Sequence, residues 1–142
     1  MNSTLENNLR TVAINSGADL FEITSAEPFL DIEEIIEQRK AKGYNADMQF
    51  TYRNPKRSTH SEMTMPDCKT LVCIAVSYEQ KQAGQPEIPS ARVAKYATSD
   101  AKDRMRNSLQ AIHTQLLNHG YKSKMLYDDN AMVDRAAAMR AG

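Results

Sequence analysis

Residues 70–77 have the sequence Thr-Leu-Val-Cys-Ile-Ala-Val-Ser, an almost uninterrupted apolar run. A run of this length, rich in β-branched side chains, predicts a strand in a sheet that is covered on both faces. Shorter strands are predicted at residues 20–24 and 121–127. Segments with helical periodicity separate the three strands, so the pattern favours an α/β fold.

Four helices are predicted around these strands, each bounded by start or stop signals. They cover residues 3–16, 28–42 and 99–118, and a last segment that opens near Ala131 and runs to the end. The polar residues 44–66 predict a long loop with short structured pieces, and residues 80–90 predict a second loop. The order αβαβαβα predicts a single layered domain over residues 1–142, with a central mixed sheet of few strands flanked by helices.

The composition is that of an ordinary globular protein. The chain has 142 residues, of which 41% are hydrophobic and 25% charged, enough for one compact domain with a core. No apolar run approaches the roughly 18 residues that span a bilayer, and the first residues lack the pattern of a secretory signal. We therefore expect a cytoplasmic protein with no membrane partner, and leave the oligomeric state open.

Charge is distributed unevenly although the formal net charge is zero. Residues 1–50 carry nine acidic and four basic groups, and residues 51–142 carry nine acidic and fourteen basic groups. The second part is compatible with an anionic partner, but the excess is below that of a typical nucleic-acid-binding domain. Glycine-rich nucleotide loops and the serine-hydrolase elbow are absent from the sequence, so those classes lack their usual support.

The two cysteines, Cys68 and Cys73, are five positions apart. In one strand this odd spacing places them on opposite faces, so we expect two reduced, buried thiols and no disulfide. Two cysteines are too few for a four-cysteine iron–sulfur site. The histidines His60, His113 and His119 have no spacing typical of a metal site, and no metal site is predicted.

A run of polar residues, Asp128-Asp129-Asn130, lies where the last predicted strand gives way to the last predicted helix. Ligands of open α/β folds bind at such positions, and a carboxyl group with a raised pKa can act there as a general acid. The same residue types are preferred helix N-caps, so capping is the competing interpretation. Because one helix needs one cap, three such residues in a row leave one or two without that role.

Residues 125–142, MLYDDNAMVDRAAAMRAG, combine an apolar strand, an aspartate, a short link and then an acidic residue and an arginine that open an alanine-rich helix. This stretch, together with residues 17–21, 55–57, 65–77 and 92–97, resembles the epoxyqueuosine reductase family, cobalamin-dependent enzymes of tRNA modification. The resemblance extends over nearly the whole chain. It is most specific at residues 125–142.

The resemblance implies an enzyme that reduces epoxyqueuosine in tRNA to queuosine. Cobalamin would be the reactive cofactor, iron–sulfur clusters would supply electrons, and tRNA would be the partner. The family's proton-donating aspartate corresponds to Asp128, with Asp129 as the alternative, and Asp128 also belongs to the cofactor-binding set. Arg57 and Arg135 correspond to basic positions that contact cobalamin, and Ala94 to a position that contacts it through the backbone.

The sequence also departs from the family pattern. Asp100 alone remains of an Asp-Tyr-His run, and residues 129–131 replace the usual link after the aspartate. The cysteine clusters that should follow Gly142 are missing. We therefore expect residues 1–142 to be the cobalamin-binding amino-terminal domain of a longer enzyme, truncated before the iron–sulfur domain and inactive by itself.

Two alternatives remain open. The chain could be a stand-alone binding module without catalysis, which the incomplete run after Asp100 and the missing cluster half favour. It could also be part of a related cobalamin-dependent reductase with a substrate other than tRNA. The neutral net charge favours the second alternative, because direct tRNA binding usually leaves a basic patch.

Overall fold

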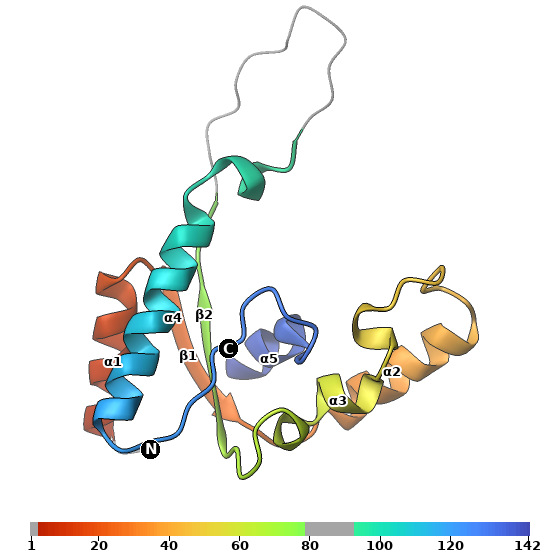
Figure 1. Cartoon of the computed structure of the whole chain (residues 1–142), viewed down its shortest axis with the longest axis horizontal. Coiled ribbons are helices and arrows are strands. Elements are labelled where there is room, and N and C mark those ends of the chain that lie inside the picture. Colours follow the sequence, from red (N-terminus) through yellow and green to blue (C-terminus); the bar gives the residue numbers. More distant parts are fainter. Residues whose placement is uncertain (1–2, 79–92) are drawn as a thin grey trace, which may run out of the picture. The chain divides into compact units, whose positions relative to one another are not determined.

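The computed structural model describes residues 3–78 and 93–142 (Figure 1). The predicted loop at residues 80–90 lies outside the described residues. Helices and strands alternate along the first part of the chain, and two further α-helices follow. In order, the elements are α1 (Ser3–Asn15), β1 (Leu20–Ser25), α2 (Leu30–Ala41), η1 (Phe50–Tyr52), α3 (Pro55–Thr59), η2 (Ser61–Met63), β2 (Thr70–Ala75), η3 (Lys95–Thr98), α4 (Ala101–Asn118) and α5 (Asp134–Ala141).

Strands β1 and β2 form a two-stranded sheet. The N–H of Asp19 donates to the carbonyl of Ala75 at one end (2.9 Å), and the N–H of Ala26 donates to that of Lys69 at the other (3.2 Å). Because the start of one strand meets the end of the other, the pair is antiparallel. The predicted α/β fold, a sheet of few strands flanked by helices, is confirmed.

Contacts divide the chain into two compact units: Met1–Phe21 with Ile74–Ser123, and Glu22–Cys73 with Lys124–Gly142. In the first unit, α1 and α4 lie side by side (Figure 1). Their facing sides are apolar at helical spacing, as the periodicity predicts. Ser108 of α4 is fully buried and its hydroxyl donates to the carbonyl of Ala13 in α1 (3.1 Å). The buried apolar residues of this unit are Leu5, Leu9, Ala13, Ala18, Phe21, Ala101, Ile112 and Leu116.

The turn between α1 and β1 is fixed by Gly17 and Asp19. Gly17 ends α1 with a φ of 118°, which a side chain would disfavour. The carboxylate of Asp19 accepts from the N–H of Ser77 (2.7 Å) and pairs with Arg104 of α4 (2.8 Å). The hydrogen bond from Ser77 is the main cause that holds the pKa of Asp19 below its ordinary value; desolvation opposes it, and the hydrogen bond and charge of Arg104 lower the pKa further.

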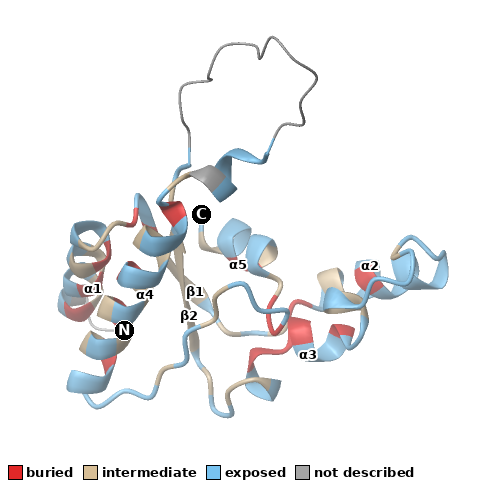
Figure 2. Cartoon of the chain, turned by 45° about the horizontal axis from the view of Figure 1, so that its top comes forward, coloured by how far each residue is buried: buried red, intermediate tan, exposed pale blue. Residues whose placement is uncertain are grey.

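The second unit has its own core, around Phe29, Met132 and Ala137. Figure 2 shows buried residues of this unit on and around α2 and α3. Half-buried side chains from α2, β2, α5 and the segment before α5 complete the cluster: Ile32, Leu71, Cys73, Leu126, Val133 and Ala136. Helix α5 is clamped at its far end, because the guanidinium of Arg140 stacks on the ring of Phe29 (3.4 Å to its centroid) and donates to the carbonyl of Glu27 (2.7 Å).

Two boundaries differ from the sequence prediction for local reasons. Helix α2 begins at Leu30, because the N–H of Phe29 donates instead to the carbonyl of Thr59 (3.0 Å) and the Phe29 ring is buried. Helix α5 begins at Asp134 rather than near Ala131. Ala131 and Met132 are buried in a turn that precedes it.

The prediction of a third strand at residues 121–127 is wrong, because that segment has no strand pairing. The N–H of Tyr121 closes the end of α4 by donating to Leu116 (2.9 Å), and the hydroxyl of Ser123 contacts Nδ1 of His113 (2.7 Å). These bonds tie the start of the segment to a helix rather than to a strand. The predicted loop at residues 44–66 is confirmed, with η1, α3 and η2 as its short structured pieces.

Candidate functional site

The candidate site is built around the turn at residues 128–133, which joins the extended segment to α5. Asp128 is exposed and has a φ of 53°, in the left-handed region that side chains rarely adopt. Oδ1 of Asp129 accepts from the N–H of Ala131 (2.9 Å), which closes the turn locally. Backbone strain of this kind persists where surrounding contacts impose it, and it is common at functional sites.

The capping interpretation of this turn is wrong. Val133 is the N-cap of α5, and no side chain accepts a hydrogen bond there. The helix starts after the turn, so Asp128, Asp129 and Asn130 lie too early in the chain to cap it. The carboxylate of Asp128 is therefore not occupied with a helix terminus, which favours the chemical interpretation of this residue.

Asp134, the first residue of α5, adds a third carboxyl group that the sequence reasoning did not single out. Burial raises the pKa of this carboxyl, and the negative charges of Asp129 and Asp128 raise it further. In the sequence, an acidic residue in a first helical turn is explained by the helix dipole alone. The signal that distinguishes Asp134 is the presence of two neighbouring carboxylates, which only the folded turn provides.

Cys73 of β2 borders this acidic group. Burial raises the pKa of the Cys73 thiol, and the charge of Asp134 raises it further. Both Cys73 and Cys68 are free thiols, as predicted, but each is half-buried rather than buried. The carboxyl of Asp134 and the thiol of Cys73 therefore hold their protons more tightly than free side chains do.

Arg57 lies on the one-turn helix α3, which is anchored to the same turn. The hydroxyl of Ser58 donates to the carbonyl of Asn130 (2.7 Å), and the N–H of Val133 donates to the carbonyl of Ser58 (3.1 Å). Asn54 caps α3 by accepting from the N–H of Arg57 (3.0 Å). Arg57 itself is exposed.

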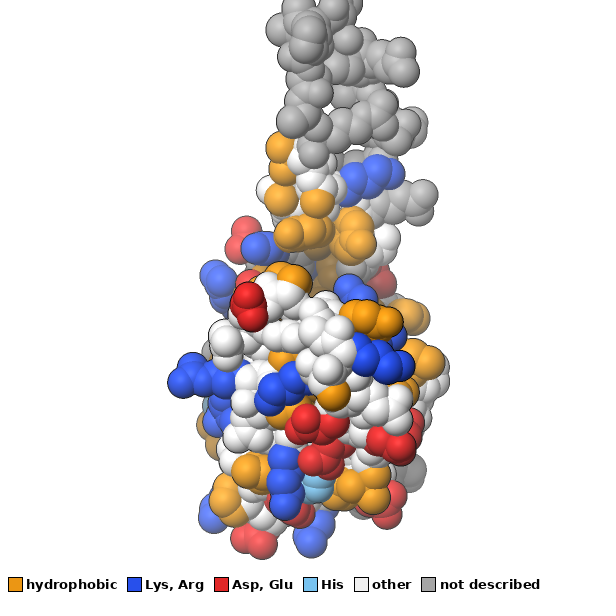
Figure 3. All heavy atoms as spheres, turned by 90° about the vertical axis from the view of Figure 1, so that its right-hand side faces the viewer, with side chains coloured by type: hydrophobic (Ala, Val, Ile, Leu, Met, Phe, Trp, Pro, Cys, Tyr) orange, Lys and Arg blue, Asp and Glu red, His pale blue; other side chains and the backbone are white. Residues whose placement is uncertain are grey.

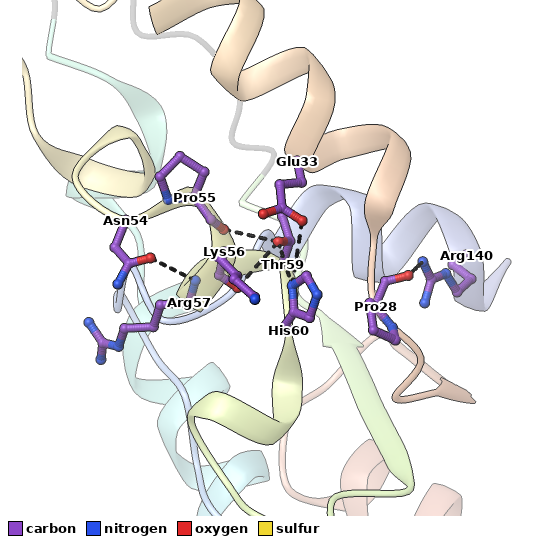
Figure 4. A network of polar contacts seen from close by, with 9 residues as sticks. All are labelled: Pro28, Glu33, Asn54, Pro55, Lys56, Arg57, Thr59, His60 and Arg140. Carbon is purple, nitrogen blue, oxygen red and sulfur yellow. Dashed lines mark hydrogen bonds and ion pairs between the residues drawn. The ribbon is translucent and has the colours of Figure 1, made fainter.

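Figure 4 shows the polar contacts that hold α3 on the side away from the Arg57 guanidinium. The hydroxyl of Thr59 contacts Nδ1 of His60 (3.1 Å), and this nitrogen lies 3.7 Å from Oε2 of Glu33 in α2. Thr59 also donates to the carbonyl of Pro55 (3.0 Å). The Arg57 guanidinium points away from this network (Figure 4). The network therefore fixes the helix and leaves Arg57 available to a ligand.

The other predicted site residues are placed as follows. Arg135 is exposed in the first turn of α5, next to Asp134, so Arg57, Asp128 and Arg135 all belong to the second unit. Ala94 belongs to the first unit, where it is exposed just before η3. Among residues 3–78 and 93–142, no cluster of histidine, cysteine or carboxylate side chains could hold a metal ion.

Known proteins with a similar sequence and fold were compared with the chain. No protein-family model matches it. An epoxyqueuosine reductase of Staphylococcus aureus is 26% identical over 145 aligned positions, which cover 97% of this chain and 38% of the relative. The resemblance to epoxyqueuosine reductases is confirmed. The structure of epoxyqueuosine reductase from Streptococcus thermophilus matches all of the chain and 39% of its own, with a TM-score of 0.76 and 23% identity, so the fold is shared. The chain thus spans about two fifths of the length of each of these reductases.

Proposed function

We propose that residues 1–142 form the cobalamin-binding domain of an epoxyqueuosine-reductase-like enzyme that reduces epoxyqueuosine in tRNA to queuosine. The likeness to a named reductase over 97% of the chain carries this proposal. Asp128 is at the position expected for the proton donor, and its carboxylate does not cap α5; both points support the proposal. A cytoplasmic location is part of the proposal, and among the described residues no helix is long and apolar enough to cross a membrane.

The reaction defines what the protein must provide. Converting an epoxide to an alkene, with the oxygen leaving as water, consumes two electrons and two protons. The chain contains two cysteines, too few for a four-cysteine cluster. The electron-supplying clusters would therefore come from a part of the enzyme beyond these residues, and this chain would contribute cofactor binding and proton transfer.

The proton donor in this proposal is Asp128, at the exposed tip of the turn. Asp134 would hold a second proton close by, because burial and the neighbouring carboxylates raise its pKa. A raised pKa makes a carboxyl group better suited to general-acid catalysis. Asp128 is exposed, so its carboxyl group would be accessible to a bound substrate.

The residues present fit cobalamin in their chemistry. When bound, cobalamin would supply the reactive cobalt centre. The exposed guanidinium groups of Arg57 and Arg135 are donors suited to the amide and phosphate oxygens of the cofactor. They lie on α3 and α5, on either side of the hydrogen bonds between Ser58 and the turn. Ala94 stays the position that the resemblance assigns to a backbone contact with cobalamin.

Charge on the surface supports a local rather than a broad anionic contact. Figure 3 shows basic, acidic and hydrophobic side chains mixed on one face of the molecule. Such a face is compatible with the third possibility, a cobalamin-dependent reductase acting on a substrate other than tRNA. A reductase acting on tRNA and a reductase acting on another substrate would share the same cofactor site and differ only in the substrate.

The cofactor test is a titration of the 142-residue chain with hydroxocobalamin, followed by visible absorption. We expect a saturable spectral change, with affinity lowered roughly 10- to 100-fold in Arg57→Ala and in Arg135→Ala, the equivalent of one hydrogen bond to a charged group each. Arg39→Ala removes an exposed arginine at the end of α2 and serves as the matched control. Equal affinity in all three variants would contradict the assigned contacts.

The substrate test uses bacteria that lack the reductase and accumulate epoxyqueuosine. Mass spectrometry of their tRNA nucleosides should detect queuosine when the chain is expressed together with the cluster-containing remainder of the enzyme. Asp128→Asn should abolish conversion by the combined parts, because it removes the proposed proton donor. Cobalamin binding without any conversion by the combined parts would instead support the non-catalytic or non-tRNA alternatives.

A further inference from the structure

Ser58 joins the two parts of the proposed site. Its side chain is almost completely buried, with 2% of its surface exposed. Its hydroxyl donates to the carbonyl of Asn130 (2.7 Å), and its own carbonyl accepts from the N–H of Val133 (3.1 Å). One residue therefore makes two hydrogen bonds across 72 and 75 positions of sequence, both to the segment between Asp128 and Arg135.

On its own side, Ser58 is held rigidly. Asn54 fixes the start of α3, and the hydroxyl of Thr59 donates to the carbonyl of Pro55 (3.0 Å). The carbonyl of Thr59 accepts from the N–H of Phe29 (3.0 Å), which attaches α3 to the core of this unit. A displacement of Ser58 would therefore also displace the backbone of its neighbour Arg57.

The turn, by contrast, has few fixed points of its own. Within it, Asp129 bonds to Ala131 (2.9 Å), and Ala131 and Met132 are buried. The carbonyl of Asn130 would lose its Ser58 partner if the hydroxyl were removed. Asp128, two residues earlier, has the left-handed φ of 53° that surrounding contacts must maintain.

We propose that Ser58 is a positioning residue that sets the place of Asp128 and Arg135 relative to Arg57. It would touch neither cofactor nor substrate and would act through the turn at residues 128–133. The functional part of this inference rests on the proposed cobalamin site. The geometric part, that the Ser58 hydroxyl fixes the turn, stands on the hydrogen bonds alone.

A second buried serine provides a matched control. Ser108 is fully buried, and its hydroxyl donates to a backbone carbonyl 95 positions away, that of Ala13 (3.1 Å). Ser108 joins α4 to α1 in the other unit, which contains none of Arg57, Asp128 and Arg135. Ser58→Ala and Ser108→Ala therefore remove the same kind of bond, and a merely structural role predicts the same consequences for both.

The experiment compares the full chain with Ser58→Ala, Ser108→Ala and the nearly isosteric Ser58→Cys. Backbone amide NMR should show shifted signals at Asp128 and Arg135 in Ser58→Ala and unchanged ones in Ser108→Ala. Cobalamin affinity should fall about five-fold or more in Ser58→Ala, the equivalent of one hydrogen bond, and less than two-fold in Ser108→Ala. Ser58→Cys, which keeps the volume and a weaker donor, should lie between Ser58→Ala and the unaltered chain.

The outcomes separate this inference from the proposed function. Unshifted Asp128 and Arg135 signals in both Ser58 variants would overturn the inference whatever the chain binds. Shifted signals with unchanged cobalamin affinity would overturn the functional part and leave the cofactor site intact. If the unaltered chain does not bind cobalamin, the proposed function fails, and the NMR comparison alone still decides whether Ser58 positions the turn.

Discussion

The backbone at Asp128 allows a direct test of strain at the proposed proton donor. Its φ of 53° is in a region where a residue with a Cβ atom costs about 1–2 kcal/mol and glycine costs almost nothing. Asp128→Ala keeps the Cβ atom, whereas Asp128→Gly removes it. Glycine loses about 0.4–1 kcal/mol through the greater entropy of its unfolded chain. We therefore expect Asp128→Gly to be more stable than Asp128→Ala, by about 0.5–1 kcal/mol.

Urea unfolding followed by circular dichroism measures this difference. Ala138→Gly, at an exposed position inside α5, is the control and should lose about 1 kcal/mol, because glycine is disfavoured within a helix. The effect of replacing alanine by glycine should thus have opposite signs at the two sites. Both Asp128 variants lack the carboxyl group, so each should lose conversion of epoxyqueuosine in the assembled enzyme. If Asp128→Ala proves as stable as Asp128→Gly, the backbone at this position is not strained and our reasoning fails.

Three further predictions follow from local geometry and charge. Gly17→Ala should lower the free energy of unfolding by more than about 1 kcal/mol, because φ is 118° and the new Cβ atom would lie 3.1 Å from the Cβ atom of Arg104. Gly43→Ala is the control: φ is 71° there, and a new Cβ atom would meet nothing within 4 Å. It should lose less stability in the same urea titration. Alkylation of Cys73 at pH 8 should be slower in the folded chain than in urea, because the thiol pKa is raised in the folded chain. Asp134→Asn should speed up the alkylation, because it removes a charge that raises this pKa. An unchanged rate in that variant would contradict the effect of Asp134 on the thiol. Asp134 binds its proton more tightly in the folded chain than in the unfolded chain, so the free energy of unfolding should fall as the pH rises above the ordinary pKa of about 4. Asp134→Asn should flatten this fall between about pH 4 and 7, as measured by urea midpoints. A pH profile of the variant that runs parallel to that of the unaltered chain would refute the raised pKa.

Much of the fold could be predicted because local sequence determines it. The apolar spacing of α1 and α4 follows helical periodicity, and Gly17 and Gly120 end these helices with positive φ, as glycine does best. The apolar run at residues 70–77 gives β2 within two residues. In each case, neighbours along the chain provide most of the information, so no knowledge of distant contacts was needed.

The wrong predictions all depend on contacts between distant residues. Residues 121–127 have the composition of a strand, but a strand also requires a neighbouring backbone, and none pairs with this segment among the described residues. The start of α5 is delayed because Met132 enters the core around Phe29, and Ala131 beside it is buried as well. Periodicity indicates that a residue is apolar, and it does not indicate which segment buries it.

The same distinction explains the candidate site. From the sequence, capping and chemistry are both open at Asp128, and the position of Val133 at the helix start excludes capping of α5. The role of Asp128 as proton donor stays a prediction. The sequence offers no reason to select Asp134, because the raised pKa of this residue arises from burial and from the charges of Asp129 and Asp128 in the folded chain.

The acidic turn has a consequence for assigning the proton donor. Because the charge of Asp128 helps to raise the pKa of Asp134, Asp128→Asn changes two groups: it removes one carboxyl and lowers the pKa of the other. A proton donor at Asp128 predicts that Asp134→Asn retains most activity and shifts only its pH profile. A donor at Asp134 predicts that Asp134→Asn abolishes activity, whereas Asp128→Asn lowers the pKa of the donor and moves the loss of activity at high pH to lower pH. The two variants, measured over a range of pH, therefore assign the proton to one carboxyl, because only the donor is required at every pH.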